Sequence, residues 1–124
     1  MLLYISDSKT VEDLQDRFNI CFPYLKLEFY KEGGSPINDC DKTYIADPNT
    51  PLAGIRKKST SGILDIKSWE KTSKLKRELK DVYGLNVQVF RMHGNEWLPT
   101  SYSDELTLKQ QSELARQCVA FRAQ

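Results

Sequence analysis

The hydrophobic pattern of this chain changes from the period of a helix to the period of a strand, and it does so twice. In the first half, four apolar residues recur at the spacing of one helix face: Val11, Leu14, Phe18 and Phe22. Thr10 and Asp13 are close to a capping box, and Pro23 ends the helix. Residues 25–31 then alternate apolar and polar side chains, as a half-buried strand does. With a short strand at residues 2–6, this pattern predicts a strand–helix–strand unit.

The same order returns after Gly62. Residues 63–67 form a predicted strand, and Gly84 ends a helix whose apolar residues are Leu75, Leu79, Val82 and Tyr83. Residues 85–91 alternate once more. The sequence FPYLKLEFYK can be aligned with YGLNVQVFR after a shift of one residue. The alignment matches Leu25 with Leu85, Leu27 with Val87 and Phe29 with Val89. We interpret this likeness as an internal repeat of two βαβ halves.

Two such halves suit the ferredoxin-like βαββαβ arrangement, in which two helices cover one face of four antiparallel strands. We therefore predict a single α+β domain over residues 1–124. Its halves are about 1–31 and 62–92, and a long loop over 32–61 joins them, with a helical turn at about 52–55. A Gly-containing turn and a last helix add a hairpin strand and a helix over 93–124. A ubiquitin-like β-grasp is the alternative for the second half.

Net charge does not steer this chain toward one kind of partner, since 18 basic residues stand against 17 acidic ones. The distribution is uneven, because residues 51–91 hold 10 basic and 4 acidic side chains, a local balance of 10 − 4 = +6. The N-terminus has no basic region before an apolar run, and no segment approaches the roughly 20 apolar residues of a membrane span. We expect a cytoplasmic protein with no membrane partner.

The chain lacks the minimum parts of the common catalytic and cofactor sites. Cys21, Cys40 and Cys118 are odd in number and far apart, which predicts free thiols rather than a disulfide framework or a zinc site. The one histidine, His93, falls in the predicted hairpin turn, and no GxGxxG, GxxxxGK, HExxH or CxxC motif is present. We expect no catalytic residue, no metal, no cofactor and no enzymatic activity.

A sheet covered by helices on one face leaves its other face open. The alternation places six aromatic and polar residues on that face: Tyr4, Tyr30, Phe90, Lys26, Lys67 and Gln88. Aromatic rings beside cations suit base stacking. Leu3, Tyr4 and Ile5 followed by TVEDLQDRF resemble the first strand and helix of the RNA-recognition motif family, which implies single-stranded nucleic acid as a ligand. Where that family carries its second signature, this chain has GILDIK, with Asp65 on the same predicted face.

The last helix provides another use for the open face. Its apolar stripe of Leu114, Cys118 and Phe121 needs an apolar partner, and we expect it to pack across Tyr4, Tyr30 and Phe90. The same stripe is also suited to a second copy of the chain, which would make a homodimer.

The stretch YGLNVQVFRMHGNEWLPT followed by LTLKQQ resembles the closing signature of an uncharacterised family of small bacterial α+β proteins. FPYLKLEFYK and the Gly-Ser-Pro of the long loop fit the same family. The resemblance singles out Arg91, Gly94, Asn95 and Trp97, and it implies no activity.

Our first hypothesis is a non-enzymatic protein-binding or adaptor module that uses the long loop, the hairpin at Trp97 or the last helix. Long loops in compact domains are often functional. The alternative is a nucleic-acid-binding domain that uses the open face and the basic middle. The candidate binding residues are Tyr4, Tyr30, Arg56, Lys57, Lys58, Arg91 and Trp97.

Overall fold

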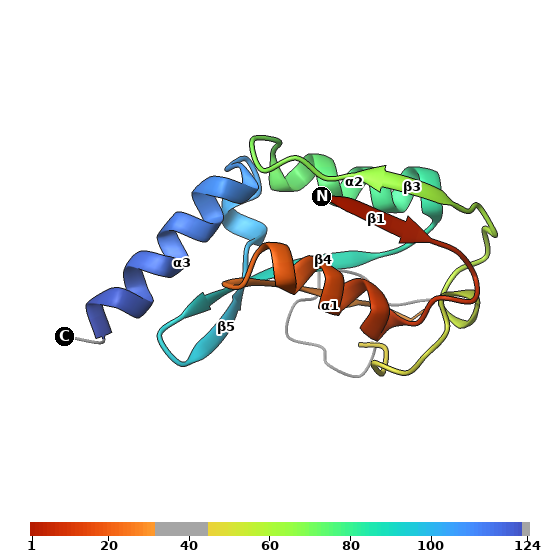
Figure 1. The fold of residues 1–124 in the computed structure, drawn as a ribbon, viewed down its shortest axis with the longest axis horizontal. Coiled ribbons are helices and arrows are strands. Elements are labelled where there is room, and N and C mark those ends of the chain that lie inside the picture. Colours follow the sequence, from red (N-terminus) through yellow and green to blue (C-terminus); the bar gives the residue numbers. More distant parts are fainter. Residues whose placement is uncertain (32–44, 123–124) are drawn as a thin grey trace.

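The structure is a computed structural model, and it describes residues 1–31 and 45–122, with side chains as far as Cys118. Figure 1 shows the arrangement of its helices and strands. The strands are β1 (Leu2–Ile5), β2 (Leu25–Phe29), β3 (Gly62–Asp65), β4 (Val87–His93) and β5 (Glu96–Pro99). The α-helices are α1 (Val11–Cys21), α2 (Thr72–Tyr83) and α3 (Leu108–Arg122), and the short 3₁₀ turns are η2 (Leu52–Gly54) and η3 (Ser101–Ser103).

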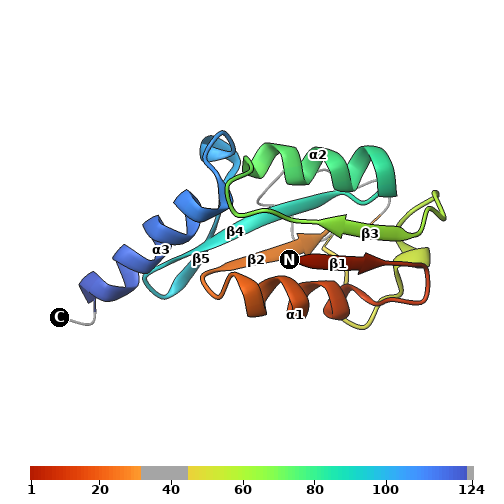
Figure 2. The ribbon, with the colours of Figure 1, turned by 45° about the horizontal axis from the view of Figure 1, so that its top comes forward.

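The strands form two antiparallel sheets. β1 pairs with β3, whereas β4 pairs with β2 on one side and with β5 on the other. Figure 2 shows β1 and β3 side by side between α1 and α2, with β2 and β4 behind them. The mixed α+β class is therefore confirmed. The ferredoxin-like sheet of four strands is not confirmed, because the described strands form sheets of two and three.

A single hydrophobic core lies between these layers. It contains buried side chains from β1 to β4 and from all three helices, and Leu108 is the residue that α3 contributes. The buried positions of the first two helices correspond, since Leu14, Phe18 and Phe22 are buried and so are Leu75, Leu79 and Tyr83, each 61 positions later. Both helices thus turn an apolar stripe to the same core. The internal repeat stays an interpretation of the sequence.

The start of α1 confirms the capping box. The side-chain Oγ1 of Thr10 accepts from the backbone N–H of Asp13 at 3.2 Å, and Oδ2 of Asp13 accepts from the backbone N–H of Thr10 at 2.9 Å. This second bond holds the pKa of the Asp13 carboxyl below its usual value, because it favours the charged form. The helix start is therefore stabilised by one charged and one neutral side chain.

The capping box makes part of the stability of this protein depend on pH. Thr10→Ala is expected to lower the free energy of unfolding by about 1 kcal/mol. The folded pKa of Asp13 lies below its unfolded value, so its contribution is present above roughly pH 4 and is lost as pH falls through the folded pKa. The difference between wild type and Asp13→Asn in urea unfolding should therefore shrink in acid. Asp16→Asn, on the exposed face of α1, is the control and should show no such trend.

The C-terminal helix packs differently from its predicted orientation. Leu108, Gln111 and Ala115 of α3 are buried, whereas Leu114 is 40% exposed. Tyr4 is 51% exposed, so α3 does not cover it. The prediction that α3 packs across Tyr4, Tyr30 and Phe90 is therefore wrong. The helix packs through the face that carries Leu108, Gln111 and Ala115, which includes a polar residue, and not through the apolar face that carries Leu114.

Candidate functional site

Arg56 is a candidate binding residue of the sequence, and in the structure its side chain is engaged by groups of the protein itself. Its guanidinium is buried and forms an ion pair with Asp7, with Nη2 of Arg56 2.8 Å from Oδ1 of Asp7. Nη1 of Arg56 also donates to the carbonyl oxygens of Thr60 at 2.8 Å and Tyr83 at 2.9 Å. Through these bonds Arg56 connects three segments: Asp7 just after β1, Thr60 in the central loop, and Tyr83 at the end of α2. A partner cannot reach it without disrupting them.

The other basic residues of the middle segment are exposed or half-buried, and several of them bond to nearby groups of the protein. Lys57 and Lys58 are exposed, and Nζ of Lys58 donates to the carbonyl of Asp81 at 2.6 Å. Three lysines at the start of α2 and along it form ion pairs: Lys71 with Glu105, Lys74 with Glu70 and Glu78, and Lys76 with Asp104. The local excess of basic residues therefore does not form one open cationic surface on α2.

The aromatic residues assigned to one open face are separated in the structure. Tyr4 is exposed on β1, in the two-stranded sheet. Tyr30 is 1% exposed, and its backbone bridges to Ile45. Phe90 belongs to β4, in the three-stranded sheet. The prediction of an exposed Tyr30 is wrong, because its side chain is buried, and Tyr4 and Phe90 lie in different sheets, so the three rings do not form one stacking surface.

Trp97 lies on the face of the β4–β5 hairpin that also carries Phe90. Nζ of Lys26 is 5.1 Å from the centroid of the Trp97 ring and 5.5 Å from that of Phe90. Lys26 also forms an ion pair with Glu28 at 3.1 Å. The cation on this face is thus held by the protein's own aromatic rings and carboxylate.

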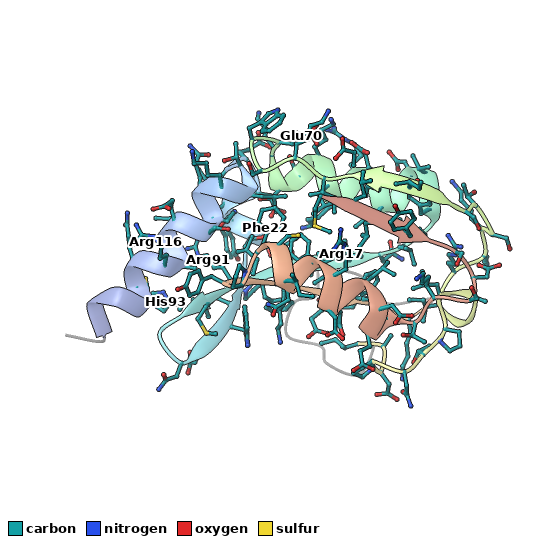
Figure 3. All side chains as sticks on the ribbon, in the orientation of Figure 1. Arg17, Phe22, Glu70, Arg91, His93 and Arg116 are labelled. Carbon is teal, nitrogen blue, oxygen red and sulfur yellow. The ribbon has the colours of Figure 1, made fainter. Side chains whose placement is uncertain are left out.

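The opposite face of the same hairpin faces α3. Gly94 turns the hairpin with a φ of 64°, a left-handed conformation that glycine adopts without strain. Because side chains alternate along β4, Arg91 and His93 point away from the Phe90 face. Figure 3 shows both residues on the side of the hairpin nearest to α3. Strand alternation and the turn therefore direct these two polar side chains at the last helix.

An open groove of about 730 Å³ lies between the hairpin and α3. We call it the hairpin–helix groove. The hairpin contributes Arg91, His93, Gly94, Asn95 and Glu96, and the helix contributes Leu114, Gln117 and Cys118. Three of the four residues singled out by the closing signature thus line this groove, and Trp97 lies on the other face of the hairpin.

A buried amide positions α3 against the hairpin. Gln111 is 0% exposed, and its Oε1 accepts from Nη1 of Arg91 at 2.9 Å. Nε2 of Gln111 donates to the carbonyl of Ser103 at 2.7 Å. At the start of α3, Thr107 and Gln110 cap each other's backbone N–H groups. One wall of the groove is therefore fixed by hydrogen bonds that join α3, η3 and β4.

In the part of the chain that the structure describes, Arg91 is held by neutral groups only. Its Nη1 donates to Oε1 of Gln111 and, at 3.4 Å, to Oγ of Ser103. Within residues 1–31 and 45–118, no carboxylate forms an ion pair with it. A guanidinium in this setting keeps donors that suit a carboxylate or phosphate of a ligand.

A histidine and a cysteine meet at the same groove. Nδ1 of His93 lies 3.5 Å from Sγ of Cys118. They are 25 positions apart, and sequence reasoning placed His93 in a solvated turn and Cys118 on a packing stripe, so no local signal joined them. The predicted free thiols are confirmed for Cys21 and Cys118, while Cys40 lies outside the described residues.

No protein-family model, curated protein or solved structure matches the chain. Among the residues that the structure describes, no helix has the length and apolar character that crossing a membrane requires. The same part of the chain holds no group of three His, Cys, Asp or Glu side chains arranged to bind a metal ion.

Proposed function

We propose that this domain is a non-enzymatic protein-binding module, and that the hairpin–helix groove takes a peptide segment carrying a carboxylate. The observation that carries the proposal is Arg91, whose guanidinium lines the groove and, among the residues that the structure describes, bonds only to Gln111 and Ser103. Charged hydrogen bonds between arginine and carboxylate are among the stronger contacts available to a binding surface. An acidic side chain or a C-terminal carboxylate of a partner is the group that Arg91 suits.

The rest of the groove supports a peptide rather than a small anion. Leu114 on α3 exposes apolar surface in the groove that Arg91 also lines, and Gly94 adds no side chain to that lining. Glu96 lies next to the turn, whereas Arg91 lies further along β4. The groove is therefore positive at its inner end and negative near the turn. This polarity favours a segment whose carboxylate enters at Arg91, with apolar residues against Leu114.

The alternative, nucleic-acid binding, has less support from the geometry. Lys71, Lys74 and Lys76 are engaged by carboxylates, and Tyr30 is buried. Phosphate contacts release counterions, so binding of that kind falls steeply as salt rises. Tight binding of single-stranded RNA that weakens strongly between two salt concentrations would favour the alternative over our proposal.

A peptide selection tests the proposed function without a known partner. The immobilised protein is used to select from a displayed random peptide library, and an enriched peptide is then measured by fluorescence anisotropy. We expect enriched sequences to carry Asp, Glu or a free carboxyl terminus. Leu114→Glu and Arg91→Gln should each weaken binding by about tenfold or more, which corresponds to about 1.4 kcal/mol.

Matched variants on α2, which contributes no residue to the lining of the groove, serve as controls. Val82→Glu makes the same kind of change at an exposed apolar residue of α2, and Arg77→Gln removes an exposed arginine of the same helix. Both should bind the peptide as wild type does. The proposal fails if no peptide is enriched, if the enriched peptides lack a carboxylate, or if the Leu114 and Arg91 variants bind normally.

A further inference from the structure

We infer that Cys118 and His93 form a thiol-modification site that reacts with low-molecular-weight disulfides bearing carboxylates. This inference concerns covalent chemistry at the groove and holds whether or not a peptide binds there. The starting observation is that Sγ of Cys118 lies 3.5 Å from Nδ1 of His93, and that both residues line the hairpin–helix groove. A thiol beside an imidazole in an open groove has the two parts of an activated nucleophile.

The two residues are brought together by elements that are themselves well anchored. His93 is the last residue of β4 and is paired across the hairpin with Glu96. Cys118 comes seven positions after the buried Gln111 and three after the buried Ala115, so it lies on the side of α3 that faces the hairpin. The contact therefore follows from the docking of α3 rather than from a local turn.

The reaction is thiol–disulfide exchange. Sγ of Cys118 attacks one sulfur of the disulfide, and the thiol proton passes to Nδ1 of His93. The S–S bond of the reagent breaks, and its second sulfur leaves as a thiolate that takes the proton back from the imidazolium. One disulfide and one protein thiol thus become one mixed disulfide and one small thiol. The disulfide is the only oxidant.

Arg91 determines which disulfides the site should prefer. It lines the same groove, and its donors are not used by any carboxylate of the described residues. A reagent that places a carboxylate at Arg91 while its disulfide reaches Cys118 is therefore held in the groove before the exchange, and a cationic disulfide has no such partner at Arg91. The carboxylate of Glu96, at the turn end of the groove, is the one group in its lining that opposes this preference. A groove of about 730 Å³ also has room for a small peptide-like group attached to Cys118.

Cys21 provides a control within the same molecule. It is an exposed free thiol at the end of α1, so it is accessible but has none of the neighbours of Cys118. Trypsin separates the two residues, since cleavage after Arg17 and Lys26 releases one and cleavage after Arg116 and Arg122 releases the other. The rate of modification of each thiol can then be followed in one sample.

The test treats the native protein with glutathione disulfide, which is anionic, or cystamine, which is cationic, and measures each peptide by mass spectrometry. With glutathione disulfide we expect Cys118 to react at least about tenfold faster than Cys21. His93→Gln should reduce the Cys118 rate to that of Cys21 and leave Cys21 unchanged. Arg91→Gln should remove the preference for glutathione disulfide over cystamine.

Three outcomes would overturn the inference. They are equal rates for Cys118 and Cys21, a fast Cys118 that His93→Gln does not slow, and an equal rate with the cationic reagent. His93 is exposed at the end of its strand, so an unchanged unfolding midpoint will show that the variant is folded. Modification of Cys118 should also block peptide binding; that consequence alone rests on the proposed function, and the rate measurements use no peptide.

Discussion

Arg56→Met is expected to lower the free energy of unfolding by about 3 kcal/mol, although Arg56 belongs to a basic run that sequence reasoning assigned to a binding surface. The guanidinium is buried and bonds to Asp7, Thr60 and Tyr83. Methionine fills a similar volume but leaves two carbonyl oxygens without their charged donor and removes the partner of Asp7. Urea unfolding followed by circular dichroism measures the change.

Two further variants separate the contributions at this site. Asp7→Asn keeps the bonds from Arg56 to the carbonyls and should cost about 1 kcal/mol, because Asp7 is 41% exposed and its charge is partly solvated. Lys57→Met changes the neighbouring exposed side chain and should stay within about 0.5 kcal/mol of wild type. An Arg56→Met variant as stable as wild type would show that the buried hydrogen bonds and the ion pair of Arg56 contribute little to stability.

Local patterns predicted the elements of this fold well. Thr10 with Asp13 marks the start of α1, and Gly84, with a φ of 69°, ends α2 as a left-handed cap. Alternation located β2 and β4. These signals succeed because helix caps and strand alternation depend on residues close together in sequence.

The same local signals do not predict which strands pair with each other. Alternation says which side chains of a strand are buried, but it does not say which strand lies alongside. β2 pairs with β4, with Leu27 opposite Val89, and this pairing joins residues from the two halves of the chain. A choice between one sheet and two therefore depended on contacts that no local pattern encodes.

The candidate site was predicted only in part, for related reasons. Arg91 and Trp97 were both singled out, yet they lie on opposite faces of the hairpin, and only Arg91 lines the groove. A charged residue in a loop is usually exposed, so Arg56 was assigned to the surface. A glutamine in a helix is usually exposed as well. The sequence therefore predicts that α3 turns its apolar face to the sheet, whereas the face with Gln111 is the buried one.

Gln111→Leu tests whether this buried amide sets the position of α3. Leucine is more hydrophobic and at least as good a helix former, so an argument from composition alone expects a more stable protein. We expect the free energy of unfolding to fall by about 2 kcal/mol instead, because the carbonyl of Ser103 keeps only the backbone N–H of Leu106 as a donor and Nη1 of Arg91 keeps only the long bond to Oγ of Ser103. Amide hydrogen exchange should become faster along α3 and remain unchanged in α1.

The matched control is Gln117→Leu, the same substitution at an exposed position on the same helix, which should stay within about 0.5 kcal/mol of wild type. If α3 loosens, Cys118 moves away from His93, and the rate of its exchange with glutathione disulfide should fall toward that of Cys21 in the Gln111 variant only. Higher stability for Gln111→Leu, with an unchanged Cys118 rate, would mean that apolar contacts of Leu108 and Ala115 alone dock the helix. The groove would then owe its shape to packing rather than to the hydrogen bonds between Gln111, Ser103 and Arg91.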